Sequence, residues 1–152
     1  MEALSAKLIG VVNAAEPRLR QLSVQVDEPV LAGGWSRRQL LGHLIDSASN
    51  NHQRFVRAAL ADALEFPAYD TPNFVRVQAV ERAPWPVLVD LWASYNRYLA
   101  HVIANLPADK LGVICRIGAN EPVTLRYLAE DYVRHLVQHL VAIGYGSTWN
   151  GT

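Results

Sequence analysis

The sequence is poor in several features that mark particular classes of protein. It has a single cysteine, Cys115, in 152 residues, which excludes an internal disulfide and is compatible with a reducing compartment. Its 14 basic and 14 acidic residues cancel, and no stretch concentrates lysine and arginine as a nucleic-acid-binding surface does. We therefore expect neither a disulfide scaffold nor a nucleic-acid partner.

Long apolar runs are also absent. No segment approaches the roughly 20 apolar residues that a transmembrane helix needs, and no basic amphipathic helix indicates a membrane surface. The start of the chain, Met1 to Lys7, mixes acid and base where a secretion signal has a basic start and a clean apolar run. We expect one cytoplasmic domain over residues 1–152 with no membrane partner, and a homodimer is one assembly that the sequence allows.

Two familiar catalytic signatures are missing. There is no His-Glu-x-x-His motif, so the glutamate that accepts the proton in zinc proteases has no counterpart, and no Ser-His-Asp signature offers a route without metal. Cys115 lies in an apolar β-like run without the basic helix-end context of a reactive thiol, which favours packing over a nucleophilic role.

Apolar periodicity predicts four helices, of which the first two have contrasting signals. The first carries an apolar stripe over residues 4–22, and Pro17 should kink or interrupt it. The second begins at Ser36, the predicted N-cap of a capping box with Gln39, and should run to about Leu64.

The third helix should begin near Pro86 and end at Pro107, and the fourth should begin at Thr124 and stop at Gly144. The link over residues 65–85 is long enough to run back along a bundle, so the second and third helices need not be antiparallel neighbours. We expect a short helical stretch within it, from Asn73 to about Val80. The β-branched run in the link 107–123 favours extended backbone, with a short hairpin as one arrangement.

Three histidines suggest a metal site. His135 and His139 are four residues apart on the inward face of the fourth helix, so both imidazoles can hold one cation. His43 lies about 10 Å into the second helix, and His139 and His135 lie about 6 and 12 Å from the end of the fourth. If these helices are antiparallel neighbours, all three imidazoles meet at one level. Three neutral nitrogens leave a bound ion with an open position, which is typical of catalytic zinc sites.

A less specific interpretation stands beside this one. A histidine pair at this spacing also arises by chance, and a buried histidine is more often a hydrogen-bonded core residue than a ligand. The other two histidines are predicted on the surface. His52 is nine residues beyond His43 and about 180° around the helix, and His101 is about 200° from the core position Leu99.

Polar residues near the histidines are candidates for supporting roles. Asp46 and Asp131 lie one turn from His43 and His135, where each can accept a hydrogen bond from an imidazole or remain a solvated charge. A strip of polar residues follows His43 along one face of the second helix. It can form the wall of a water-filled pocket, or it can be the exposed edge of the helix. In the pocket interpretation Arg54 meets an anionic group of the substrate. The strip consists of Ser47, Asn50 and Arg54.

At these residues the chain resembles the DinB/YfiT-like superfamily. The matching segments, which occur in the same order and at similar separations over essentially the whole chain, are Trp35-Ser36, Gly42-His43-Leu44-Ile45-Asp46-Ser47, Asn51-His52-Gln53-Arg54-Phe55 and Tyr132 to Leu140. The resemblance implies an all-α fold, an up-down-down-up four-helix bundle with a long crossover between its second and third helices. It also implies a divalent metal, zinc or nickel, on His43, His135 and His139.

The resemblance also implies a choice of chemistry. Characterised relatives include transferases that use low-molecular-weight thiols, and a thiol-dependent isomerase. A three-imidazole metal can activate water, which gives a hydrolase, or hold a thiol as thiolate, which gives an S-transferase with the thiol as cosubstrate. In both, the partner is a small-molecule substrate. The alternative is a non-catalytic metal- or ligand-binding stress-response bundle. Relatives often have an aromatic-rich segment after a Tyr-Asp pair, whereas Tyr69-Asp70 here continues with Thr71-Pro72, so the substrate stays open.

Overall fold

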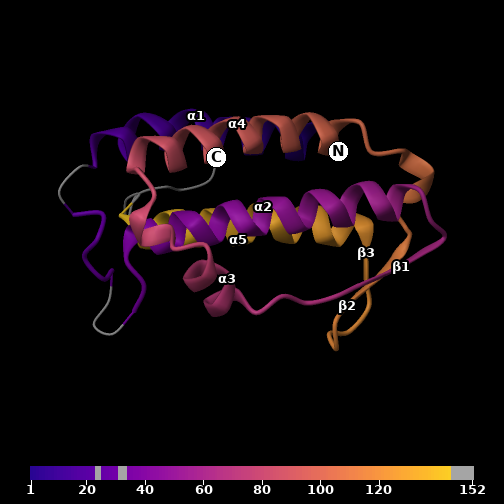
Figure 1. The fold of residues 1–152 in the computed structure, drawn as a ribbon. Helices are drawn as coiled ribbons and strands as arrows, with labels where there is room; N and C mark the ends of the chain where they lie inside the picture. Colours follow the sequence, from indigo (N-terminus) through magenta and orange to yellow (C-terminus); the bar gives the residue numbers. More distant parts are fainter. Residues whose placement is uncertain (23–24, 31–33, 145–152) are drawn as a thin grey trace.

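The computed structural model describes residues 1–22, 25–30 and 34–144, and it is a bundle of four long helices (Figure 1). In Figure 1, the second and third of these helices run in one direction and the first and fourth in the opposite direction. The predicted all-α, up-down-down-up four-helix bundle is therefore confirmed. The four are α1 (Glu2–Gln21), α2 (Arg37–Ala59), α4 (Trp85–Ala104) and α5 (Leu125–Ile143).

The order of packing around the bundle differs from the order along the chain. Helix α4 packs between α1 and α2, and α2 packs against α5. The crossover that allows this contains the short helix α3 (Thr71–Val77) and the 3-10 turn η1 (Val80–Arg82), which both contact α2. As a result α2 and α5 are antiparallel neighbours, which is the arrangement that brings His43 level with the histidines of α5.

Both of these helices begin where their caps predict. The Ser36 hydroxyl accepts a hydrogen bond from the Gln39 backbone N–H at 3.2 Å, and the Gln39 side chain accepts one from the Ser36 N–H at 3.0 Å. In α5 the Thr124 hydroxyl accepts from the Tyr127 N–H at 3.2 Å, and Gly144 ends the helix with a left-handed φ of 105°. These interactions satisfy N–H groups that a helix start leaves unpaired, and they set the height of each histidine.

The C-terminal end of α2 was predicted wrongly. The helix ends at Ala59 rather than near Leu64, because residues Ala63–Phe66 form strand β1. This strand pairs in parallel with β2 (Ile114–Ile117), which also pairs antiparallel with β3 (Val123–Thr124) in the expected hairpin. Ala, Leu and Glu favour helices locally, so only the hydrogen bonds to β2, fifty residues later in the chain, select the strand.

Helix α1 is not interrupted at Pro17, contrary to one of the two predicted outcomes. The apolar stripe continues on both sides of the proline, where Val12 and Leu19 are fully buried. Packing of these side chains into the core outweighs the backbone hydrogen bond that proline removes.

The core lies between the four long helices and under the small sheet. Among its fully buried large side chains are Trp92, Phe55, Leu41, Leu44, Leu99, Leu136 and Leu140. Cys115 points from β2 into this core, where burial raises the pKa of its thiol, in keeping with a packing role.

Across the described part of the chain, no helix is both long enough and apolar enough to cross a membrane.

One glycine lets the crossover pack tightly on α2. A Cβ at Gly42 would lie 2.5 Å from Cγ1 and 2.9 Å from Cγ2 of Val80. We predict that Gly42→Ala lowers the free energy of unfolding by about 1–3 kcal/mol, because overpacking outweighs the better helix propensity of alanine. Denaturant unfolding measures the change, and Val80→Ala in the same background should recover part of it. An undiminished free energy of unfolding in Gly42→Ala would contradict this close packing.

Candidate metal centre

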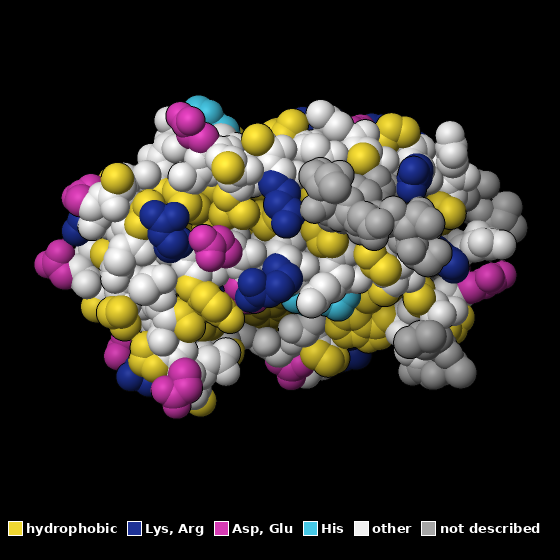
Figure 2. Space-filling model, turned by 180° about the vertical axis from the view of Figure 1, so that it is seen from behind, with side chains coloured by type: hydrophobic (Ala, Val, Ile, Leu, Met, Phe, Trp, Pro, Cys, Tyr) yellow, Lys and Arg dark blue, Asp and Glu magenta, His cyan; other side chains and the backbone are white. Residues whose placement is uncertain are grey.

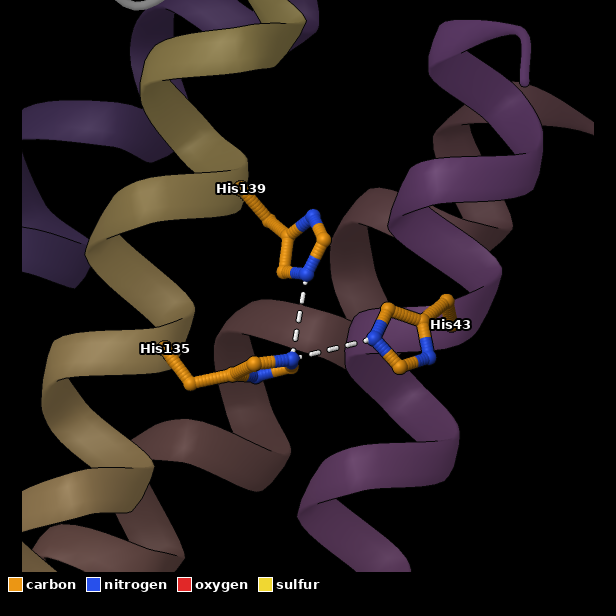
Figure 3. A group of neighbouring side chains, drawn as sticks. All are labelled: His43, His135 and His139. Carbon is orange, nitrogen blue, oxygen red and sulfur yellow. Dashed lines mark hydrogen bonds between the residues drawn. The ribbon is translucent and has the colours of Figure 1, made fainter. Parts of the chain in front are cut away.

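The three predicted histidines meet between α2 and α5. His43 comes from α2, and His135 and His139 come from successive turns of α5, with the rings pointing toward one another (Figure 3). The Nε2 atom of His135 lies 3.2 Å from Nε2 of His43 and 3.0 Å from Nε2 of His139. The three residues offer ligand atoms that all lie within 4.8 Å of one another.

Burial keeps these imidazoles neutral. Desolvation, strengthened by the two neighbouring histidines, lowers the pKa of His43 to about 4. Desolvation, together with His139, also lowers the pKa of His135 to about 4, and burial lowers the pKa of His139. All three rings are thus deprotonated at neutral pH, the form that a metal ligand must have.

The donor set fits a divalent ion. Bonds of about 2.0–2.1 Å from Zn²⁺ to imidazole place tetrahedral ligand nitrogens about 3.3 Å apart, close to the two Nε2 separations in this cluster. The edge of the Trp35 ring, 5.5 Å from His43 between ring centroids, packs against that imidazole and restricts its orientation. Among the described residues, the metal-competent group consists of three histidines without a fourth His, Cys, Asp or Glu.

A cavity of about 200 Å³ opens beside the cluster. Figure 2 shows a histidine side chain exposed in the middle of one face of the molecule, beside basic and hydrophobic side chains. The cavity extends from the histidines along α2 and α5 and under the start of α3. Its lining residues are His43, Ser47, Asn51, Arg54, Tyr69, Thr71, Leu128, Asp131, Tyr132 and His135.

The two acidic residues that could support the histidines lie in different places. Asp46 is buried but turns toward the crossover, where its Oδ1 accepts a hydrogen bond from Gln78 at 2.9 Å. Nδ1 of His43 has no hydrogen-bond partner among the described residues, so the bond to Asp46, one of the two alternatives for this aspartate, is not formed. Asp131 lines the cavity beside His135 and favours the charged form of that imidazole, while its carboxylate pairs with Arg134 at 2.5 Å.

The predicted polar strip on α2 is divided. Ser47 and Arg54 line the cavity, as the pocket interpretation requires, but Asn50 does not. Asn50 lies in a neighbouring groove against α3, and Asn51 takes the place that was predicted for it. The reason is that α3 covers one side of the α2 face, so residues only slightly apart in rotation enter different spaces.

Several cavity residues were not predicted. Tyr69 and Thr71 come from the crossover, and Tyr132 comes from α5. The Tyr69-Asp70 pair was the available sequence signal for the crossover, but nothing local indicated that it folds back over α2. Tyr132 is largely a core residue of α5, and its hydroxyl donates to the buried Asn96 at 2.5 Å.

The remaining histidines lie away from the cluster. His101 is exposed, as predicted. The prediction for His52 is only partly right, because this residue is half-buried between α2 and α4. Its Nδ1 lies 3.1 Å from the Tyr95 hydroxyl, and its ring packs edge-on against Tyr95 and Tyr98.

Comparison with known proteins identifies the family. The sequence model of the DinB superfamily matches residues 8–143. This stretch includes most of α1, the other three long helices and all three clustered histidines. The chain belongs to the DinB superfamily.

Two relatives resemble this DinB protein over most of its length. A Bacillus pumilus protein named "Putative metal-dependent hydrolase" is 27% identical over 145 residues, which cover 94% of this chain and 82% of that protein. The solved structure of YfiT from Bacillus subtilis, described as "a probable metal-dependent hydrolase with an unusual four-helix bundle topology", aligns with a TM-score of 0.77 at 23% identity. That alignment covers 92% of this chain and 83% of YfiT.

Proposed function

We propose that this DinB protein is a metal-dependent hydrolase of a small molecule, in which His43, His135 and His139 hold one divalent ion. The observation that carries the proposal is the convergence of three neutral imidazoles at the wall of a cavity, without a fourth ligand from the described residues. A closed structural site would have four protein ligands. The name of the Bacillus pumilus relative supports the same activity.

The chemistry that the ion supplies when bound is that of a Lewis acid, which can lower the pKa of water to about 7. Zinc and nickel both suit a set of imidazole ligands. His43 on α2, and His135 and His139 on α5, would hold the ion, and packing along the two helices fixes their relative position. Tyr69 and Thr71 of the crossover complete the wall of the cavity, together with α5 and α2 residues such as Ser47.

Within this proposal Asp131 has a role as proton acceptor. Among the described residues that line the cavity, Asp131 is the one with a carboxylate, and it lies next to His135. Because no glutamate follows a histidine as in zinc proteases, this aspartate is the available group for taking a proton from the attacking nucleophile. The carboxylate also pairs with Arg134, and this ion pair is half-exposed.

Hydrolysis of 4-nitrophenyl esters by the metal-loaded protein tests the proposal. We expect His43→Ala to lose both metal and activity. Asp131→Asn should keep the metal and lower kcat by about 10²–10⁴-fold, the usual contribution of a general base. His101→Ala, which changes an exposed histidine outside the site, is the matched control and should retain both. Full esterase activity in the His43→Ala variant would refute the proposal.

A thiol S-transferase is the second candidate, favoured by the buried cation Arg54 in the same cavity, which suits an anionic thiol cosubstrate. The discriminating assay offers low-molecular-weight thiols with an epoxide or an activated halide. Acceleration of this reaction without ester hydrolysis would replace the hydrolase proposal by the transferase. Inactivity in both assays with the metal present would favour a non-catalytic binding protein.

A further inference from the structure

The guanidinium of Arg54 has an unusual environment. Arg54 is only 9% exposed, and its Nε is buried without a hydrogen-bond partner in the described part of the chain. The contact recorded for Nη1 is one long hydrogen bond of 3.5 Å to Oδ1 of Asn51. Among the described residues, no carboxylate lies within ion-pair distance of Arg54.

A buried charge without a partner opposes folding. Arginine rarely becomes fully buried unless a carboxylate or a ligand compensates for the lost hydration. Desolvation lowers the pKa of Arg54, which shows the direction of this cost. The guanidinium carbon lies 5.5 Å from the centre of the Phe66 ring, a cation–π contact that orients the group but leaves its hydrogen-bond donors free. The side chain is therefore held in position with unused donors.

The buried acid Asp46 does not compensate for this charge. It forms no ion pair with Arg54, and its Oδ1 accepts a hydrogen bond from Gln78. Tyr69, whose pKa is raised mainly by burial, is neutral at physiological pH and cannot serve as a counterion. The donors of Arg54 thus remain available to a molecule in the cavity.

Arg54 and the histidines line one cavity, with Ser47 and Asn51 between them on α2. Arg54 is eleven residues after His43, about 16 Å along the helix axis. Both side chains lean toward the N-terminus of α2, but the arginine side chain is the longer one, which shortens this separation. A small molecule of the size of the cavity, about 200 Å³, can contact both ends.

We propose that Arg54 binds a carboxylate or phosphate group of the substrate, and that the substrate class is therefore small organic anions whose reacting group reaches the histidine cluster. The planar fork of an arginine side chain pairs with both oxyanions through two parallel hydrogen bonds. The hydroxyls of Ser47 and Thr71 line the same cavity and add hydrogen-bonding groups to its wall. The reaction of this substrate at the histidine cluster rests on the proposed hydrolase function. The binding of an anion by Arg54 does not depend on it.

Binding is tested first, by calorimetric titration of the metal-loaded protein with glutarate, neutral glutaramide and inorganic phosphate. We expect glutarate to bind at least about 30-fold more tightly than glutaramide, since hydrogen bonds to a charged group contribute about 2 kcal/mol. Arg54→Gln should remove the preference, and Arg54→Lys, which retains the charge without the fork, should keep part of it. Tighter binding of phosphate than glutarate would indicate a phosphate group in the substrate.

The matched control is Arg57→Gln, one turn further along α2. Arg57 is exposed and donates to Gln53 at 3.2 Å, outside the cavity, so its replacement should leave glutarate binding unchanged. Circular dichroism and the metal content of each variant verify the fold and the histidine cluster. Unchanged glutarate affinity in a folded Arg54→Gln variant would overturn the proposal.

Activity separates this proposal from the hydrolase proposal. The substrates are mono-4-nitrophenyl glutarate and its neutral methyl ester. We expect the anionic ester to have a kcat/KM at least about 30-fold higher, and Arg54→Gln to remove this preference mainly through KM. If glutarate binds through Arg54 but neither ester is hydrolysed, the anion site stands and the hydrolase fails. If both esters react equally and glutarate does not bind, the hydrolase stands and the anion site is overturned.

Discussion

Replacing His139 with alanine is expected to weaken metal binding by more than about 100-fold. Loss of a group that only hydrogen-bonds to a ligand usually weakens affinity by 10–100-fold, so the loss of a ligand itself should exceed this. His139 supplies one of three converging nitrogens, with its Nε2 3.0 Å from that of His135. In the variant two imidazoles remain, and the ion would have to complete its coordination with water.

Elemental analysis of the purified proteins measures this effect. We expect about one divalent ion per chain in the wild type and in His101→Ala, whose imidazole is exposed and outside the cluster. His43→Ala should behave like His139→Ala, because the two rings come from different helices but point toward the same place (Figure 3). Full occupancy in a His43→Ala/His139→Ala double variant would exclude this cluster as the metal site.

Chelation of the metal should lower the melting temperature by about 10 °C and leave the helices folded. The proposed ion would bind side chains from α2 and α5 together, at a site that the unfolded chain lacks, so its binding would add to the free energy of unfolding. A metal concentration about 1,000 times the Kd adds about 4 kcal/mol, and each kcal/mol corresponds to roughly 2–4 °C in a protein of this size. The buried apolar residues of all four long helices should keep the metal-free bundle intact.

Thermal unfolding followed by circular dichroism, with and without chelator, measures the shift. The His43→Ala variant should melt at the same temperature in both conditions, whereas the wild type and His101→Ala should show the full shift. Loss of helical signal at room temperature on chelation would show that the ion, and not the core, holds the bundle together. An unchanged melting temperature in the wild type would argue against a metal shared by α2 and α5.

Local patterns were sufficient for the parts of the molecule that depend on neighbouring residues. The capping box of Ser36 and Gln39, and the termination of α5 at Gly144, depend on groups within one turn of a helix. The pairing of His135 and His139 follows from the helical repeat alone. The position of His43 could be predicted from its distance to a cap, once the helices were taken as antiparallel neighbours.

Non-local contacts decided the rest. Strand β1 replaces the predicted end of α2 because it finds a partner in β2, far along the chain. Helix α3 divides the polar strip of α2, so that Asn51 and not Asn50 enters the cavity. In both cases the local sequence allows more than one outcome, and the hydrogen bonds and packing of a distant segment select one of them.

The same distinction applies to the chemistry of the site. Residue type and spacing on α2 and α5 were enough to indicate three candidate metal ligands and a polar wall that contains Arg54. They could not show that Arg54 is buried without a carboxylate, since its surroundings come from Phe66 and Tyr69 in the crossover. Whether a charge is solvated, paired or left for a ligand depends on every element that packs around it. For this protein that was decided by the return of the crossover along α2, which the tertiary structure alone reveals.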